Sequence, residues 1–175
     1  LLAHQAGLQK ETPGVRIWNQ FTEISDQSYP EEALFFKGIK NMEFVYAPRA
    51  TAHGQKYSNL GYNILAMILA DLKNPGPQKY WQRFQSIVEN DWVKPLQLKA
   101  CYNLKGWRLA QLAQGYVENS NGGGLRPAPK VTHPLGYSGS VGVYSTPYDL
   151  GRFMHEMLLG VQGKSSIIKL SLIHI

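Results

Sequence analysis

The sequence predicts an α+β protein in which helices dominate and strands are few and short. Apolar residues recur at helical spacing in three stretches, two in the middle of the chain and one near residue 150. A fourth stretch, residues 138–145, alternates small and β-branched residues, as a short strand or extended wall does. With 175 residues, the chain is long enough to build one hydrophobic core around these elements.

The first expected helix covers residues 60–72. Its apolar side chains recur at helical spacing: Leu60, Ile64, Leu65, Ile68, Leu69 and Leu72. Asn59 precedes this run and is expected to cap the helix, because its side-chain oxygen can accept a hydrogen bond from a first-turn N–H group. Pro75-Gly76-Pro77 ends the helix, since proline lacks the N–H that a helix interior needs.

A second amphipathic segment follows at residues 80–88. Its larger apolar side chains fall on one face: Tyr80, Trp81, Phe84, Ile87 and Val88. Pro95 marks the far limit of this helix, because the residue before a proline is pushed out of the helical region. We expect the two helices to pack against each other.

A third helix is expected after Thr146-Pro147-Tyr148-Asp149, a capping box with proline at the first helical position. Its buried stripe is expected to comprise Leu150, Phe153, Met154, Met157 and Leu158. Residues 119–134 are rich in glycine and proline and are expected to form a surface loop.

The composition excludes several classes of function. The formal net charge is +6, but Lys and Arg are scattered, and a nucleic-acid partner would require a dense basic patch. A single cysteine rules out an internal disulfide, and no Cys/His cluster has the spacing of a zinc site. We therefore expect no metal, no cofactor and no nucleic acid. No apolar run approaches the ~20 residues that span a bilayer, although membrane association of another kind stays open.

Tyr57-Ser58-Asn59 is the strongest candidate for chemistry. A tyrosine and an asparagine on either side of one residue, where a loop enters a helix, can direct a phenol oxygen and an amide into one cleft. Such a pair suits a proton shuttle beside a nucleophile. Ser58 is expected to position the backbone; the rival interpretation, that it is itself the nucleophile, lacks a lysine or histidine base at suitable spacing.

Five segments, in family order along nearly the whole chain, resemble landmarks of the serine β-lactamase-related family. They are Leu1-Leu2-Ala3-His4-Gln5-Ala6-Gly7-Leu8, which is similar to a helix-to-loop segment before the cleft, Tyr57-Ser58-Asn59 (Tyr-x-Asn), Lys94-Pro95-Leu96-Gln97-Leu98 (Pro-Leu-Gly-Met), Gln114-Gly115-Tyr116 (Gly-Tyr) and residues 142–153 (Gly-Gly-x-x-Ser-Thr-x-x-Asp-Leu-x-x-Phe). The family includes class C β-lactamases, D-alanyl-D-alanine carboxypeptidases and related esterases. The resemblance implies a β-lactamase/transpeptidase-like fold, of which an internal fragment covers mainly the helical lobe.

The resemblance also implies roles for particular residues. Tyr57 would move protons to and from the serine of a Ser-x-x-Lys motif, and Asn59 would orient the lysine of that motif and the substrate amide. Val141 and Gly142 would belong to the substrate-binding wall opposite, facing the same cleft, with Tyr137 nearby; packing is the alternative role for Val141 and Tyr137.

The implied function is a serine hydrolase that forms an acyl-enzyme with β-lactams, D-amino-acid peptides or small esters. The alternative is a non-catalytic relative that keeps the lobe as a binding or interaction module. Residues 9–46 would shape an acyl-side pocket through four aromatic side chains, Trp18, Phe21, Phe35 and Phe36. Gln9 and Glu11 are weaker candidates for substrate contact in the same loop, and four histidines have no assigned role: His4, His53, His133 and His155.

The chain departs from the family pattern in two motifs. Ser166-Ile167-Ile168-Lys169 matches Ser-x-x-Lys only in spacing and comes too late in the order, and no Lys-Thr-Gly or His-x-Gly strand follows. We therefore expect residues 1–169 to be a partial domain that is inert alone. Residues 170–175 resemble the translated end of a sequencing adapter and are expected to be non-native. A periplasmic, secreted or cell-envelope location is implied by the resemblance alone.

Overall fold

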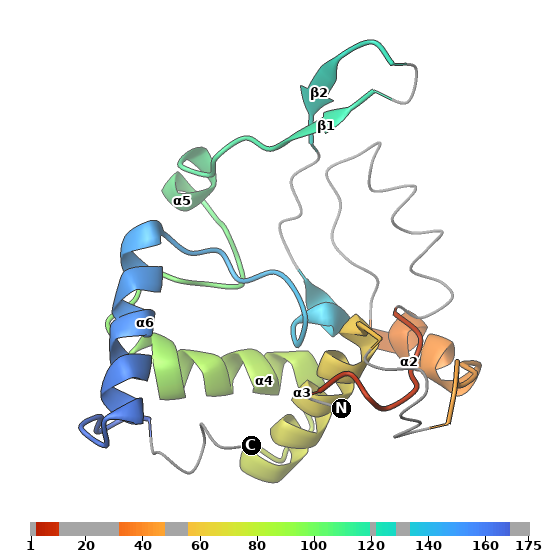
Figure 1. Cartoon of the computed structure of the whole chain (residues 1–175), viewed down its shortest axis with the longest axis horizontal. Coiled ribbons are helices and arrows are strands. Elements are labelled where there is room, and N and C mark those ends of the chain that lie inside the picture. The colour runs from red at the N-terminus through yellow and green to blue at the C-terminus, as the bar shows by residue number, and fades with distance from the viewer. Residues whose placement is uncertain (1–2, 11–31, 48–55, 120–121, 129–133, 169–175) are drawn as a thin grey trace.

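The computed structural model describes residues 3–10, 32–47, 56–119, 122–128 and 134–168, which leaves the expected non-native tail outside it. In these residues the α-helices are α2 (Glu32–Lys40), α3 (Asn59–Lys73), α4 (Tyr80–Val88), α5 (Trp107–Ala110) and α6 (Pro147–Val161). The strands β1 (Tyr116–Glu118) and β2 (Leu125–Pro127) form an antiparallel pair (Figure 1). The predicted helix-rich α+β architecture with short strands is confirmed.

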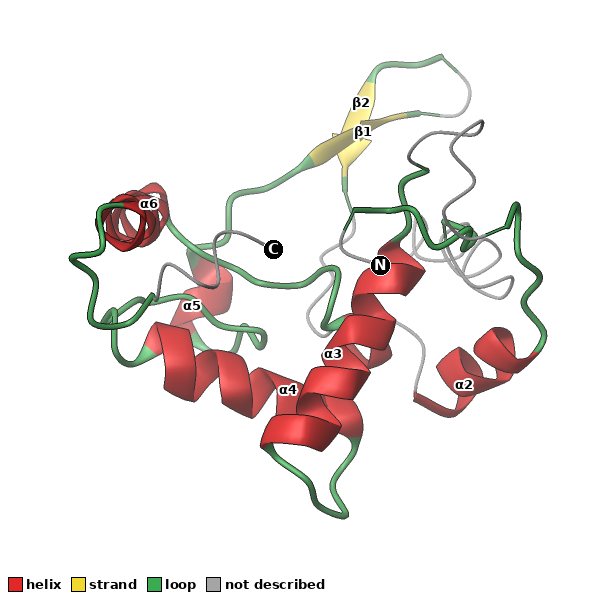
Figure 2. Cartoon of the chain, turned by 60° about the horizontal axis from the view of Figure 1, so that its bottom comes forward, coloured by secondary structure: helices red, strands yellow, loops and turns green. Residues whose placement is uncertain are grey.

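Helices α3 and α4 form the centre of the structure and pack against each other, as predicted (Figures 1 and 2). Helix α3 ends where the Asn74 N–H bonds to the Ala70 carbonyl at 3.0 Å, just before the predicted proline stop. Arg83 of α4 pairs with Asp71 of α3, with 2.6 Å between the charged atoms. Helix α4 continues into a π-helical segment, η2 (Glu89–Val93), which brings the helical path close to Pro95.

The hydrophobic core lies where α2, α3, α4 and a 3₁₀ turn, η3 (Leu135–Tyr137), come together. Its buried members are Phe35, Leu60, Ala70, Tyr80, Trp81 and Tyr137. The Phe35 ring meets the Tyr137 ring edge-on at 5.2 Å between centroids, and the Tyr80 hydroxyl donates to the Gly136 carbonyl. The placement of Phe35 on a substrate-facing loop was therefore wrong, because residue 35 lies on a helix and its apolar ring is buried in the core.

Of the two alternatives expected for residues 138–145, a short strand or an extended wall, the strand is wrong. A turn follows η3, and the extended part is limited to a single bridge between Tyr144 and Cys101, with N–H to O distances of 2.8 and 3.0 Å. The turn lies directly on α3 at Gly139, where an added Cβ would stand 2.6 Å from the Ala66 Cβ and from the Tyr62 carbonyl oxygen. This segment is therefore shaped by its close contact with α3 rather than by pairing in a sheet.

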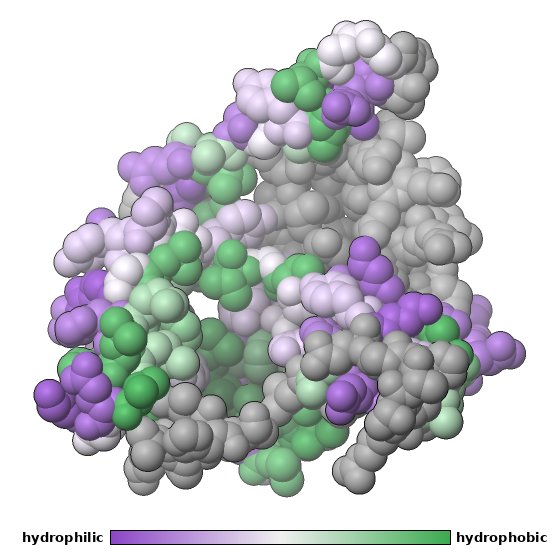
Figure 3. All heavy atoms as spheres, viewed as in Figure 1, coloured by the Kyte–Doolittle hydropathy of each residue, from purple (hydrophilic) through white to green (hydrophobic). Residues whose placement is uncertain are grey.

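Helix α6 begins after the predicted N-cap, where the Thr146 hydroxyl accepts the Asp149 N–H at 3.1 Å. The Asp149 carboxylate accepts the Lys99 N–H. Its apolar stripe is only partly covered. Phe153 and Met157 are half-buried, whereas Leu150, Met154 and Leu158 are each 58% exposed, so the prediction of a buried stripe was wrong for these three residues. Figure 3 shows apolar side chains gathered over this helix. The described residues cover one edge of the stripe, where the Trp92 and Phe153 rings meet at 5.6 Å.

Two further segments differ from expectation. Residues 3–10 contain no helix; Gly7 has a φ of +70°, and a Cβ there would lie 2.0 Å from the Tyr46 carbonyl oxygen. Within the expected loop at 119–134, strand β2 pairs with β1, and the Asn119 N–H bonds to the Gly124 carbonyl at 2.9 Å to close the hairpin. Among the helices of the described residues, none is both long and apolar enough to cross a membrane.

Candidate active site

The site is built at the start of α3, where Ser58 is the N-cap residue with an extended backbone (φ −144°, ψ 110°). Its side-chain oxygen accepts the Gly61 N–H at 3.1 Å and donates to the Gln9 carbonyl at 2.6 Å. The expectation that Asn59 caps the helix was wrong, since the short serine side chain one position earlier already reaches the first turn.

Ser58 is suited to a structural role. The residue is 4% exposed, and its hydroxyl hydrogen is used in the bond to Gln9. A nucleophilic serine needs access to substrate and a nearby base to take its proton. Burial and the Gln9 bond therefore favour the interpretation of Ser58 as a residue that positions its two neighbours.

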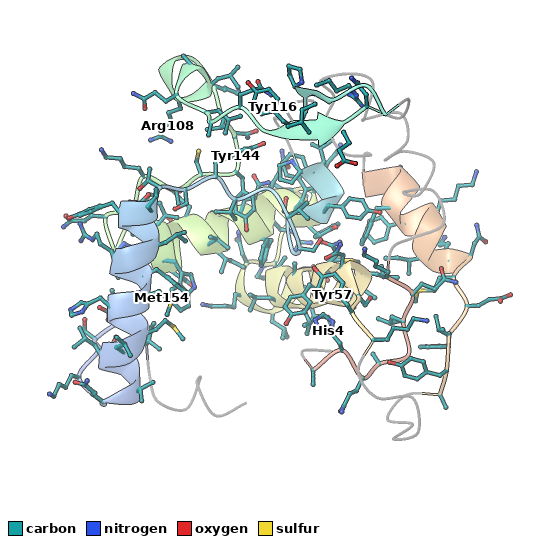
Figure 4. All side chains as sticks on the ribbon, turned by 45° about the horizontal axis from the view of Figure 1, so that its top comes forward. His4, Tyr57, Arg108, Tyr116, Tyr144 and Met154 are labelled. Carbon is teal, nitrogen blue, oxygen red and sulfur yellow. The ribbon has the colours of Figure 1, made fainter. Side chains whose placement is uncertain are left out.

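Those neighbours form a hydrogen-bonded pair. The Tyr57 hydroxyl donates to the Asn59 side-chain oxygen at 2.6 Å, and Tyr57 is 57% exposed. Figure 4 shows Tyr57 at the beginning of α3. A phenol that can exchange a proton and an amide that can orient a partner thus meet on the exposed side of one helix start. This arrangement can serve proton transfer to a group that approaches from solvent.

The segment 3–10 holds this helix start from the outside. The Lys10 carbonyl accepts the N–H groups of Asn59 and Leu60 at 3.0 and 3.3 Å. Together with the Ser58 cap, these bonds satisfy the first N–H groups of α3 within the protein itself. The positions of Tyr57 and Asn59 therefore depend on a segment that is remote in sequence.

A second remote segment reaches α3 one turn farther along. The Ser140 hydroxyl donates to the side-chain oxygen of Asn63 at 3.2 Å, and Asn63 is fully buried. Asn63 was not among the site residues predicted from the sequence. Its position four residues after Asn59, on the same helix face, was the available signal.

The two expected wall residues have packing roles in the structure. Val141 is half-buried and packs against the core cluster. Gly142 has a φ of +94°, and a Cβ on it would stand 2.4 Å from the Pro134 Cβ. Tyr137 belongs to the core, with 1% exposure. Contact between Val141 or Gly142 and a substrate stays a prediction.

Two residues farther along the same segment line a cavity that is separate from the start of α3. Tyr144 and Ser145 border a cavity of about 320 Å³ together with Lys99, Cys101 and Arg108. Neither Tyr57 nor Asn59 lines this cavity. A single cleft shared by the α3 start and residues 140–145 therefore stays a prediction as well.

Several other candidates cannot be placed. Glu11, Trp18, Phe21, His53 and His133 all lie outside the described residues. In the part of the chain that is described, no three His, Cys, Asp or Glu side chains come close enough together to hold a metal ion.

The model of the β-lactamase family matches residues 1–170, almost the whole chain. This chain belongs to the β-lactamase family. A curated member, Beta-lactamase-like protein 4 of Dictyostelium discoideum, is 30% identical over 176 aligned residues, which include 97% of this chain but 27% of that protein. The chain thus spans about a quarter of this relative.

Solved structures of other proteins have the same fold. A D-amino acid amidase from Ochrobactrum anthropi SV3, in complex with D-phenylalanine, superposes with a TM-score of 0.64 at 21% identity, over 96% of this chain and 44% of the amidase. A class C β-lactamase superposes with a TM-score of 0.60 at 18% identity, over 88% of this chain and 35% of that enzyme. The β-lactamase/transpeptidase-like fold predicted from the sequence motifs is confirmed.

Proposed function

We propose that this chain is part of a serine hydrolase that works through an acyl-enzyme, with Tyr57 as its proton-transfer residue and Asn59 as its orienting residue. The observation that carries the proposal is the 2.6 Å bond from the exposed Tyr57 hydroxyl to the Asn59 side chain at the start of α3. Membership of the β-lactamase family supports it, since the Tyr-x-Asn spacing resembles that of the family's catalytic motif.

In the proposed reaction the serine of a Ser-x-x-Lys motif, which this sequence lacks at a matching position, attacks the acyl carbonyl. As the new C–O bond forms, the serine proton passes to the Tyr57 oxygen while the phenol gives its own proton to the leaving nitrogen or oxygen, whose bond to the acyl carbon breaks. Water then hydrolyses the acyl-enzyme and returns a proton to the serine oxygen. Asn59 holds the substrate amide, which reduces the entropy that must be lost before attack.

For the substrate we propose a D-amino-acid amide or peptide, or a small ester, ahead of a β-lactam. The superposition with a D-amino acid amidase makes the first class a reasonable choice, although one fold serves several acyl transfers. We also propose a periplasmic, secreted or cell-envelope location, which follows from the family resemblance and which fractionation of the producing cell can test.

The test is Tyr57→Phe in the full-length protein that contains this sequence. The change removes the phenol oxygen and keeps the ring, so we expect the acylation or deacylation rate to fall by roughly 10²–10⁴-fold. Single-turnover kinetics on D-amino-acid amides, p-nitrophenyl esters and a cephalosporin measure the loss. Thermal melts show whether folding is intact.

Tyr116→Phe is the matched control. Tyr116 is 59% exposed on β1, close to the 57% of Tyr57, so its loss removes an equally exposed phenol outside the site. A Tyr57→Phe rate within a few-fold of the parent would show that Tyr57 does not transfer the proton. If the full-length protein has lost the serine or the lysine at the position of the Ser-x-x-Lys motif, that would instead favour the non-catalytic binding module.

A further inference from the structure

His4 had no assigned role from the sequence, yet it contacts the residues on both sides of Tyr57. Its backbone carbonyl accepts the Lys56 N–H at 3.2 Å, and its Nδ1 accepts the Ser58 N–H at 3.1 Å. Two hydrogen bonds from one residue therefore fix the backbone before and after Tyr57. We call this pair of bonds the His4 bracket.

The imidazole ring of His4 also touches the Tyr57 side chain itself. The two ring centroids lie 4.9 Å apart with 39° between the planes, and Figure 4 shows the two side chains next to each other. A second contact, at 5.1 Å, joins the His4 ring to Tyr62 on the next turn of α3. Together with the bracket, these ring contacts restrict the direction in which the phenol points.

The backbone of His4 is held in an unusual conformation. Its φ is +55°, in the left-handed region where residues other than glycine are uncommon. The Tyr46 hydroxyl donates to the same His4 carbonyl at 3.2 Å and helps to keep it in place. Backbone strain of this kind persists where the surrounding contacts over-determine the geometry, and it is concentrated at functional sites.

The bracket requires one particular form of the imidazole. Because Nδ1 accepts the Ser58 N–H, it carries no proton, and the hydrogen-bond geometry assigns the ring proton to Nε2. A side chain that offers an acceptor at the δ position is therefore needed to hold Ser58. Asparagine offers one, since its Oδ1 is attached to Cγ as Nδ1 is in histidine.

We propose that His4 is a positioning residue for Tyr57, which acts through the bracket and the ring contact to hold the phenol in the orientation used for proton transfer. This inference rests on the proposed function of Tyr57. Tyr57 precedes α3 and is more than half exposed, so the helix and the core restrict its side chain little. Its orientation must come from local contacts, and those with His4 and Asn59 supply them.

The test compares two variants that both tolerate the left-handed backbone but differ in the acceptor. His4→Gly removes the side chain, and His4→Asn keeps an oxygen where Nδ1 accepts. Both are made in the full-length protein, alone and combined with Tyr57→Phe. His155→Asn is the control, because His155 is an exposed histidine on α6.

We expect His4→Gly to lower kcat by roughly 10-fold to 100-fold with little change in KM, since misplacement of a reacting group affects the transition state more than ground-state binding. His4→Asn should keep most of the rate that His4→Gly loses. In the Tyr57→Phe background, neither variant should change kcat by more than about two-fold, because there is no phenol left to position.

The double-mutant cycle separates the possible failures. Equal losses from His4→Gly with and without the phenol would refute the positioning role and leave the role of Tyr57 intact. A Tyr57→Phe variant with the parent's rate would overturn both proposals together. If His4→Gly does not fold, the cycle with His4→Asn decides in the same way, since a residual loss that persists without the phenol contradicts the inference. A loss that follows the melting temperature across all variants would contradict it too.

Discussion

The starts of α3 and α6 are alike in local structure and differ in what surrounds them. In each, a hydroxyl at the N-cap accepts an N–H from the third residue beyond it at 3.1 Å, Ser58 from Gly61 and Thr146 from Asp149. Both match the pattern by which short polar side chains begin helices. Local sequence therefore explains both helix starts equally well.

The surroundings explain why only one of them is a candidate site. At α3, residues 3–10 bond to the cap, to the first turn and to both neighbours of Tyr57. At α6, Asp149 is 2% exposed and accepts the Lys99 N–H at 3.0 Å, while Tyr148 and Leu150 are exposed. The comparison indicates that the cap accounts for the helix start in both places, whereas the candidate site at α3 depends on the exposed Tyr57 and Asn59 pair beside the cap, which residues 3–10 hold in place.

Two glycine substitutions give the largest expected contrast. Gly139→Ala should destabilise the chain by about 1–3 kcal/mol, because its Cβ would overlap the Ala66 Cβ and the Tyr62 carbonyl oxygen of α3. Gly151→Ala on α6 should stabilise it by about 0.5–1 kcal/mol, since nothing lies within 4 Å of the added Cβ and alanine favours a helix. Urea denaturation of both variants measures the difference, and shifts of the same sign would contradict it.

The two caps should differ in a smaller way. Ser58→Ala removes the acceptor for Gly61 and the donor to Gln9 at a buried position, so we expect a loss near 2 kcal/mol, the upper end for caps. Thr146→Ala should cost about 1 kcal/mol, because a single capping bond is lost there. Equal losses in urea denaturation would mean that the Gln9 bond adds nothing to the α3 cap.

The stability of the chain at alkaline pH tests the segment that leads to α6. Burial raises the pKa of Tyr102 above its ordinary value of 10.0, and Tyr102 follows Cys101 in the bridge that leads to α6. The unfolded chain releases this proton first, so stability should fall as the pH rises above about 10, by at most ~1.4 kcal/mol per pH unit. Tyr102→Phe should flatten this part of the urea-derived stability curve, relative to the parent, and an unchanged slope would exclude Tyr102 as the cause.

The smallest effect is expected at Gln97, which stands where the family motif has glycine. Its φ is +51°, a conformation that glycine adopts without steric cost. Gln97→Gly should therefore stabilise the chain by up to ~1 kcal/mol, after the greater freedom of glycine in the unfolded state is subtracted. A higher melting temperature would agree with this expectation, and a lower one would show that the Gln97 side chain contributes more than the strain costs.

Much of the helical framework was predictable from sequence. The helices predicted from the periodic apolar residues of α3 and α4, the proline stop and the Thr146 N-cap of α6 were all confirmed, because each depends on neighbours within about one turn. The Tyr57 and Asn59 pair was also visible as a motif, since the two residues stand two positions apart and meet through one hydrogen bond.

Only the tertiary structure decided the rest. His4, Gln9 and Lys10 reach the start of α3 from across the chain, and no spacing in the sequence signals that approach. The turn at Gly139 lies against α3 where a strand was expected, and Phe35 is buried in the core where a substrate-facing loop was expected. The predicted stripe of α6 has the correct periodicity, but its burial depends on which surfaces come to face it. Periodicity is a property of the local chain, whereas contact between distant segments arises from packing and hydrogen bonding in three dimensions.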